Sequence, residues 1–202
     1  MRTTYTVIAM ASHKAGIGAK MERAALELHA ERGSLKMTAA EIAARAGTTE
    51  RTFFRHFPDK LDAFFGDESR LRAQADDVIQ ACPGEMSALA AALTGLAALA
   101  AAFDTNSDII RNRAAVIAAH PELQAREMAR TAPWTSHIKQ ALQRRGFPAD
   151  EVGIAAPLAL TAFRIAYGQW IGQPQAQGFD QRLREILPQI AAQVIRAQRD
   201  FS

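Results

Sequence analysis

The sequence predicts an all-α protein, in which three short helices are followed by a larger helical bundle. Strand-like alternation of apolar and polar residues is absent, and the only stretch rich in β-branched residues is the short Tyr5–Ile8 segment. Apolar residues recur instead at three- and four-residue steps, as helices require. Proline and glycine stand where these patterns stop.

Capping residues and glycines support the individual helix ends in the first part of the chain. Nine helices are expected, near residues 20–32, 38–46, 49–56, 59–80, 85–103, 107–119, 121–146, 150–171 and 179–198. Gly33 follows the first helix, where a left-handed cap is favoured. Thr38 and Glu41 have capping-box spacing at the start of the second. Gly47 accommodates the turn to the third helix, which Thr49 can cap.

The later helices are delimited mainly by proline and glycine. Pro121 and Pro148 stand at breaks, and Gly146 ends the long seventh helix. The segment 172–178 is a polar loop. One apolar stripe on helix 85–103 is formed by Leu89, Leu93, Leu96 and Phe103. Its other faces are largely alanine, which predicts burial inside a bundle.

Composition and charge exclude several classes of protein. Hydrophobic residues make up 49% and charged residues 22%, as in ordinary globular proteins. The single Cys82 excludes an internal disulfide and a multi-cysteine metal site, and it fits a reducing cytoplasm. The apolar run 88–103 is shorter than a bilayer span of roughly 20 residues. We therefore expect a cytoplasmic protein without a membrane segment, a secretion signal, a metal or a cofactor.

The charge lies unevenly along the chain. Residues 1–65 carry ten Lys or Arg against seven acids, so the whole net charge of +3 lies in the first third. Chance explains such a surplus, and so does a basic module that faces a polyanion. We expect a flexible arm at residues 1–19, a first domain at 20–66 and a second domain at 67–202.

The stretch from Lys36 to Lys60 predicts a helix-turn-helix. Two short helices meet at the glycine turn; Ile42 faces inward on the first, and Phe53 and Phe57 anchor the second to the core. The residues left for the other faces of the second helix and its approach are Thr48, Glu50, Arg51, Thr52, Arg55 and His56. This geometry inserts the second helix into a DNA major groove.

The chain from Lys20 to about Gly66 resembles the DNA-binding domain of the TetR family of transcriptional repressors. The matching positions are Ala24-Ala25, Leu28, Gly33, Thr38, Ile42-Ala43, Ala46-Gly47, Thr52-Phe53-Phe54, His56-Phe57 and Asp59-Lys60. At the position of Phe54 the family usually has tyrosine, whose hydroxyl reaches a phosphate. Phe54 is therefore carried over only as an apolar contact.

The predicted DNA contacts divide into phosphate contacts and base contacts. Thr38, His56 and Lys60 are the expected phosphate contacts, Lys60 because it opens a helix whose dipole attracts anions. The expected base-reading residues are Thr48, Thr49, Arg51, Thr52 and Arg55, with Arg51 directed at a guanine edge. Plainer roles remain open: a solvated Arg55–Glu50 pair, a surface His56 or a helix-end charge at Lys60.

The second part resembles, more loosely, the C-terminal domain of mycofactocin-system and related actinobacterial TetR-type regulators. The matching residues are Arg111-Asn112-Arg113, His120-Pro121-Glu122-Leu123-Gln124-Ala125-Arg126, Trp134, Phe163-Arg164 and Trp170. The resemblance implies an organic effector, such as an acyl thioester. The candidate ligand-binding residues are Phe103, Arg113, Trp134, Phe163 and Tyr167. Each aromatic also suits a plain core, and Arg113 also suits a pair with Asp104 or Asp108.

These features favour a ligand-responsive repressor that binds a palindromic DNA operator as a homodimer. The last two helices are the expected interface, because long apolar stripes run along them. Those stripes are Ile154, Leu158, Ala162 and Ile165, then Leu183, Ile186, Ile190 and Val194; burial within one subunit is the alternative. A helical protein-binding scaffold that does not bind DNA is the second interpretation. An enzyme is not expected, because the five histidines are scattered and no phosphate-binding glycine loop appears.

Overall fold

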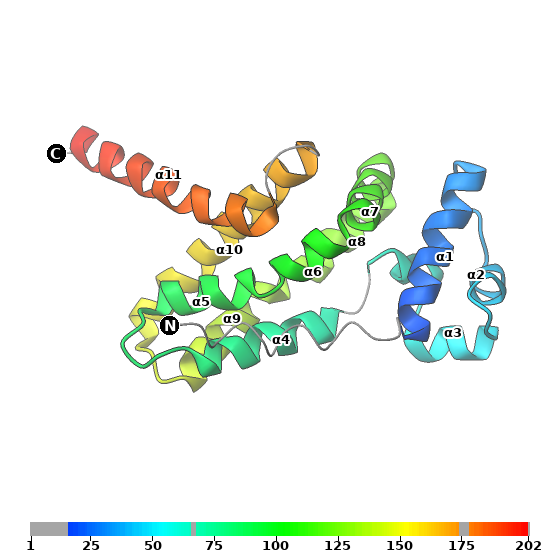
Figure 1. The fold of residues 1–202 in the computed structure, drawn as a ribbon, viewed down its shortest axis with the longest axis horizontal. Helices are drawn as coiled ribbons and strands as arrows, with labels where there is room; N and C mark the ends of the chain where they lie inside the picture. The colour runs from blue at the N-terminus through cyan, green and yellow to red at the C-terminus, as the bar shows by residue number, and fades with distance from the viewer. Residues whose placement is uncertain (1–15, 66–67, 174–177, 202) are drawn as a thin grey trace. The chain divides into compact units, whose positions relative to one another are not determined.

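The computed structural model describes residues 16–65, 68–173 and 178–201, and the described residues contain helices and no strand. The chain divides into two compact units, Met1–Asp67 and Glu68–Ser202. Figure 1 labels their helices in chain order. The all-α fold expected from the sequence is confirmed.

The described residues of the first unit form three α-helices and a short 3-10 helix. The α-helices are α1 (Ile17–Arg32), α2 (Ala39–Arg45) and α3 (Glu50–His56), and the 3-10 helix is η2 (Lys60–Phe64). Their shared core contains the fully buried side chains of Met21, Met37, Ile42, Phe53 and Phe64. Helix α1 begins earlier than expected, because residues 17–19 of the expected arm are helical. The rest of that arm, up to residue 15, lies outside the described residues.

Side-chain caps fix the two short helices of the helix-turn-helix. The Thr38 hydroxyl accepts a hydrogen bond from the Glu41 N–H, and the Glu41 carboxylate accepts one from the Thr38 N–H at 2.7 Å. The Thr49 hydroxyl likewise accepts from the Thr52 N–H. Gly47, with φ of 71°, makes the turn between them. The predicted capping box, cap and glycine turn are confirmed.

Replacing Thr38 with Ala should destabilise the first unit by about 1 kcal/mol, because it removes the side-chain half of the capping box. Urea unfolding measures the change. Thr38→Ser keeps the hydroxyl and serves as the matched control. Equal stability of the alanine and serine variants would show that the cap contributes nothing.

Stability should also fall in acid through Glu41. Its carboxylate accepts hydrogen bonds from the Arg32 guanidinium and from the Thr38 N–H and hydroxyl, and these contacts lower its pKa from 4.5 to about 2. Because the folded pKa is the lower one, the contribution is complete above about pH 4.5 and is lost as the pH falls towards 2. Between neutral and acid pH, the urea concentration at the unfolding midpoint should therefore fall further for the wild type than for Glu41→Gln. Equal movement would contradict the assignment.

The prediction of one continuous helix at 59–80 is wrong. The chain forms η2, and α4 (Glu68–Ala81) begins after the two residues that lie outside the described part. Asp59 accepts a hydrogen bond from the Leu61 N–H and starts a tight turn. Residues 61–65 are all buried in succession, which a half-exposed α-helix does not allow.

The second unit is a bundle of eight helices by the described residues. They are α4, α5 (Ala88–Ala97), α6 (Ala100–Thr105), α7 (Ser107–Ala119), α8 (Pro121–Thr131), α9 (Pro133–Arg144), α10 (Ala149–Gly172) and α11 (Phe179–Asp200). Helix α10 packs against α5, α9 and α11, and α4 packs against α5 and α9. The second half of α11 extends away from the other helices of this unit (Figure 1), and residues 191–201 are exposed.

Two of the longer expected helices are each broken in two. The helix expected at 85–103 is interrupted at Ala98 and Leu99, where the Gln74 side chain of α4 donates a hydrogen bond to the Ala98 carbonyl. The helix expected at 121–146 is interrupted at Ala132, because Pro133 has no N–H and starts α9. The helix expected at 107–119 is confirmed with its bounds unchanged.

The apolar stretch across α5 and α6 has a role in the core. Residues 88–105 have the length and hydropathy of a membrane span by composition alone. They form two helices rather than one, and Ala88, Ala91 and Leu96 are buried. A Cβ on Gly95 would lie 2.6 Å from Cγ1 of Ile79 and 2.9 Å from the Ala75 carbonyl oxygen. The missing side chain therefore allows α4 and α5 to approach closely.

Candidate nucleic-acid interface and effector site

Helix α3 has one buried face and one exposed, basic face. Phe53 is fully buried, and its ring centroid lies 5.3 Å from that of Phe57. Arg51 and Arg55 are exposed and, four residues apart, they lie on the same side of the helix. Phe54 is 53% exposed and its ring packs edge-on against Phe53. An exposed apolar ring beside two arginines can contact a sugar or a thymine methyl group.

The threonines that precede and begin α3 differ in their freedom to contact DNA. Thr49 is exposed and Thr48 and Thr52 are half-buried. The Thr49 and Thr52 hydroxyls lie 3.1 Å apart and share a hydrogen bond, in addition to the cap. Because these two hydroxyls already bond each other, Thr48 retains more freedom to donate outward.

The expected phosphate contacts stand in different local settings. Thr38 and His56 are exposed, and the Thr38 hydroxyl donates to the Glu41 carboxylate at 3.0 Å. The Lys60 ammonium donates to the carbonyls of Leu35 and Met37, at 3.2 and 3.0 Å. Lys60 thus braces the loop between α1 and α2, a contact that the sequence did not indicate.

Ion pairs separate the basic residues of the first unit into two groups. Arg32 pairs with Glu41 at 2.8 Å, and Arg45 pairs with Glu31 at 2.7 Å. These contacts lower the pKa of Glu31, chiefly through the Arg45 hydrogen bond. Among the residues that the structure describes, Arg51 and Arg55 have no such ion pair, and neither does Glu50, so the anticipated Arg55–Glu50 pair does not form. Helix α3 therefore carries uncompensated positive charge.

Three of the five predicted ligand-binding residues come together in the second unit. The Phe103 ring centroid lies 6.0 Å from that of Phe163 and 5.9 Å from that of Tyr167. Trp170 and Phe179 complete this aromatic cluster, and each lies within ring-contact distance of Phe103. Phe179 was missed from the sequence because it follows a polar loop rather than sitting in an apolar stripe.

Charged residues of α7 and α8 act on the aromatic cluster through Tyr167. Burial, with the nearby charge of Glu127, raises the pKa of Tyr167 to about 12, although the charges of Arg113 and Arg111 oppose the shift. Burial and the charge of Glu68 also raise the pKa of Glu127. Arg113 is half-buried, and its charge acts on the pKa of Tyr167.

Trp134 lies apart from the aromatic cluster. Its ring centroid lies 6.0 Å from that of His137 and 5.7 Å from the Arg72 guanidinium carbon. Asp104, considered as a partner for Arg113, instead accepts a hydrogen bond from the Phe179 N–H at 2.8 Å and caps α11.

The apolar stripes of α10 and α11 are divided between the core and the surface. Leu183 and Ile186 are buried, whereas Ile154 is 70% and Val194 60% exposed. Ile165 is 40% exposed and helps to line a surface hollow with Thr161 and Arg164. Complete burial of both stripes within one subunit is therefore wrong.

Comparison with known proteins follows this division of the chain. Residues 23–64 match the family model described as bacterial regulatory proteins, tetR family. Residues 83–194 match the MftR C-terminal domain, and this second match spans more than half of the chain. The chain belongs to the TetR family. As a TetR-family protein it is a transcriptional regulator with a DNA-binding helix-turn-helix, and the family is not a class of enzymes.

Two known TetR-family proteins illustrate the likeness. A Mycobacterium tuberculosis protein named for regulating mycofactocin biosynthesis, MftR, is 31% identical over 150 residues, which cover 73% of this chain and 76% of the relative. A crystal structure of the Thermus thermophilus TetR-family repressor FadR, in complex with lauroyl-CoA, aligns with a TM-score of 0.52. That alignment covers 85% of this chain and 91% of FadR at 19% identity, so it bears on the fold alone.

Proposed function

We propose that this protein is a transcriptional repressor that binds a palindromic operator as a homodimer and is released by a small organic effector. An acyl thioester is the proposed effector class, and the cytoplasm is the proposed compartment. Effector binding favours a conformer in which the two α3 helices no longer match successive major grooves of the operator.

The exposed arginine pair of α3 is the observation on which this proposal depends. Arg51 and Arg55 lie side by side on a capped helix whose opposite face is anchored by Phe53. A folding role does not account for two exposed like charges, four residues apart, that have no acidic partner among the described residues. Guanine edges and phosphates are partners that suit guanidinium groups in this position.

Dimerisation is supported by the apolar side chains that α10 and α11 leave uncovered. Ile154, Val194 and Ile195 are each more than half exposed, on the last two long helices. Adjacent exposed apolar side chains, such as Val194 and Ile195, are typical of protein contact surfaces. A twofold pair also supplies the second α3 helix that reading a palindrome needs.

The effector proposal rests on the aromatic cluster and on one relative. Phe103, Phe163 and Tyr167 offer an apolar lining, and Arg113 lies near enough to Tyr167 to offer a charged end to an acidic ligand. FadR, which shares the fold, is described in complex with lauroyl-CoA. A chain with an apolar tail and an anionic head suits both parts of this environment.

The test begins by selecting duplexes that bind the full-length protein from a random DNA library. Fluorescence anisotropy then measures affinity for the selected duplex and for a scrambled one at several salt concentrations. We expect a twofold-symmetric selected sequence, and affinity that falls steeply as salt rises. A protein that enriches no sequence and binds neither duplex would overturn the proposal and favour the scaffold interpretation. Adding acyl-CoA esters of increasing chain length tests the effector, which should lower operator affinity.

A further inference from the structure

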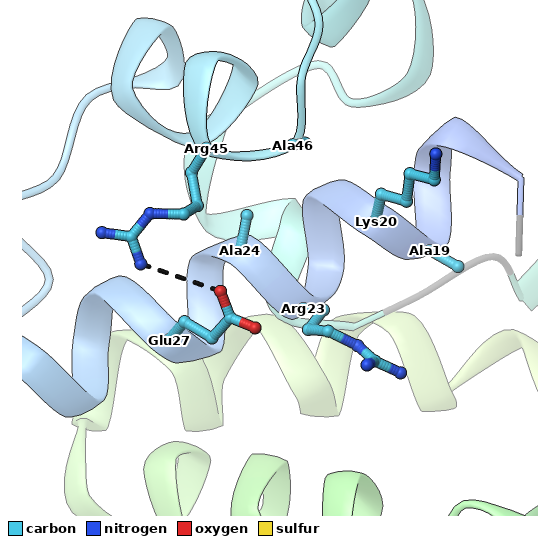
Figure 2. A pocket seen from close by; sticks show the side chains of 7 residues that line it. All are labelled: Ala19, Lys20, Arg23, Ala24, Glu27, Arg45 and Ala46. Atoms are coloured by element: carbon cyan, nitrogen blue, oxygen red, sulfur yellow. Dashed lines mark ion pairs between the residues drawn. The ribbon is translucent and has the colours of Figure 1, made fainter.

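A hollow in the first unit is lined by basic side chains that belong to α1 and α2 rather than to α3. It has a volume of about 320 Å³ and lies between the first half of α1 and the end of α2 (Figure 2). We call it the α1 groove, and its lining includes Lys20, Arg23, Ala24, Glu27, Arg45 and Ala46. We propose that Lys20 and Arg23 bind backbone phosphates of the same DNA duplex whose bases α3 contacts. This inference rests on the proposed DNA-binding function.

The charges of the α1 groove fall into a neutralised part and an uncompensated part. Arg45 lies 3.7 Å from the Glu27 carboxylate and also pairs with Glu31, so its charge is matched by acids. The Lys20 and Arg23 side chains are exposed and have no ion pair or hydrogen bond among the described residues. Figure 2 shows their side chains directed away from the Arg45–Glu27 pair, each to a different side of α1. An anion that enters the groove therefore meets two available cations.

Helix α1 gains nothing from these two charges by itself. Lys20 and Arg23 are three residues apart, near enough for their like charges to repel each other. The acidic residues that neutralise other α1 and α2 arginines are engaged elsewhere in the unit, as the pairs of Arg32 and Arg45 show. A polyanion removes this repulsion, and it neutralises both charges at once.

The α1 groove lies near both ends of α3. Ala46, in its lining, directly precedes the Gly47 turn that leads into α3. At the other end, a Cβ on Gly18 would lie 3.8 Å from Nδ1 of His56, the last residue of α3. The first turns of α1 therefore flank α3 within one compact unit. When α3 occupies a DNA major groove, the phosphates at the edge of that major groove lie beside α3. Long basic side chains of the first turns of α1 can reach these phosphates.

The chemistry of the two residues fits phosphate rather than base recognition. Lysine offers three donors on a flexible stem, and arginine suits phosphate oxygens with two parallel N–H groups. Both act through charge and read no sequence, so they add affinity to every duplex alike. They would compensate for the phenylalanine at position 54, where the family's usual tyrosine hydroxyl is missing.

The test compares the full-length wild type with Lys20→Gln/Arg23→Gln on the selected operator and on a scrambled duplex. Loss of two phosphate contacts should reduce the slope of log affinity against log salt concentration by about two units. The ratio of wild-type affinity to variant affinity should therefore shrink about tenfold between about 50 and about 200 mM salt. The affinity loss should be equal on both duplexes. Lys20→Arg/Arg23→Lys keeps both charges and should restore the wild-type slope.

Arg196→Gln/Arg199→Gln supplies the matched control, because it removes two exposed charges with the same three-residue spacing on α11; since α11 belongs to the proposed dimer interface, light scattering must show that this variant keeps the oligomeric state of the wild type. A Lys20/Arg23 variant that behaves like this control would overturn the inference, and so would a loss confined to the operator. Thermal melting must show that both variants remain folded, which the exposure of all four side chains predicts. Failure of the wild type to bind any duplex would instead overturn the proposed function itself.

Discussion

Replacing Phe53 with Ala should destabilise the first unit by about 3–5 kcal/mol and abolish DNA binding with it. Phe53 is fully buried in α3, and its ring contacts both Phe54 and Phe57. Truncation leaves a cavity among large side chains such as Met21, Met37 and Phe64 that are already fully buried, and surrounding structure relaxes only partially to refill such a cavity. The unfolding midpoint in urea, followed by circular dichroism, measures the loss.

Phe54→Ala is the matched control for this change. It removes the same ring from the next residue of the same helix, but Phe54 is 53% exposed. Its stability should change by less than about 1 kcal/mol, because little buried area is lost. Similar destabilisation by both substitutions would contradict the assignment of Phe53 to the core and Phe54 to the surface.

Replacing Arg51 with Ala should weaken operator binding by about 1–3 kcal/mol and relax the preference for one base pair. Arg51 is exposed on α3 and forms no ion pair among the described residues, so folding should not require it. Anisotropy titrations on the selected operator, and on duplexes substituted one base pair at a time, measure both effects.

Arg51→Lys separates charge from geometry in the same experiment. Lysine keeps the positive charge but cannot make the paired hydrogen bonds that a guanidinium makes to guanine. The lysine variant should therefore keep affinity for a scrambled duplex and lose preference for the operator. Equal losses on operator and scrambled DNA for Arg51→Ala would show that Arg51 contacts only phosphate.

The sequence predicts helix ends well where the deciding chemistry is local. Thr38, Thr49 and Gly47 act through side chains or backbone angles a few residues away, and all three behave as expected. It predicts poorly where the deciding contact comes from another helix. The break after α5 involves Gln74, which lies 24 residues from the carbonyl it contacts. The tight turn of η2 depends on burial of five consecutive residues, which no periodic pattern encodes.

The candidate sites show the same limit. Sequence alone counts the basic residues of the first unit but does not tell which ones are neutralised. Arg45 forms an ion pair with Glu31, 14 residues away, only because α2 packs against α1. Lys60 finds two carbonyls of the loop between α1 and α2 for the same reason. In the second unit, the four-residue spacing of Phe163 and Tyr167 predicts that they share one helix face, whereas their contact with Phe103 and the separate place of Trp134 depend on how the helices pack.

The mutual contacts of the aromatic cluster bear on how tightly any effector could be held. Phe103 lies within ring-contact distance of Phe163, Tyr167, Trp170 and Phe179. A ligand that binds among these rings has to separate them, so part of its intrinsic binding free energy offsets the cost of opening the cluster. Its measured dissociation constant would then exceed the intrinsic one by the inverse of the fraction of molecules already open. Substitutions that loosen the rings should consequently tighten binding while lowering the melting temperature.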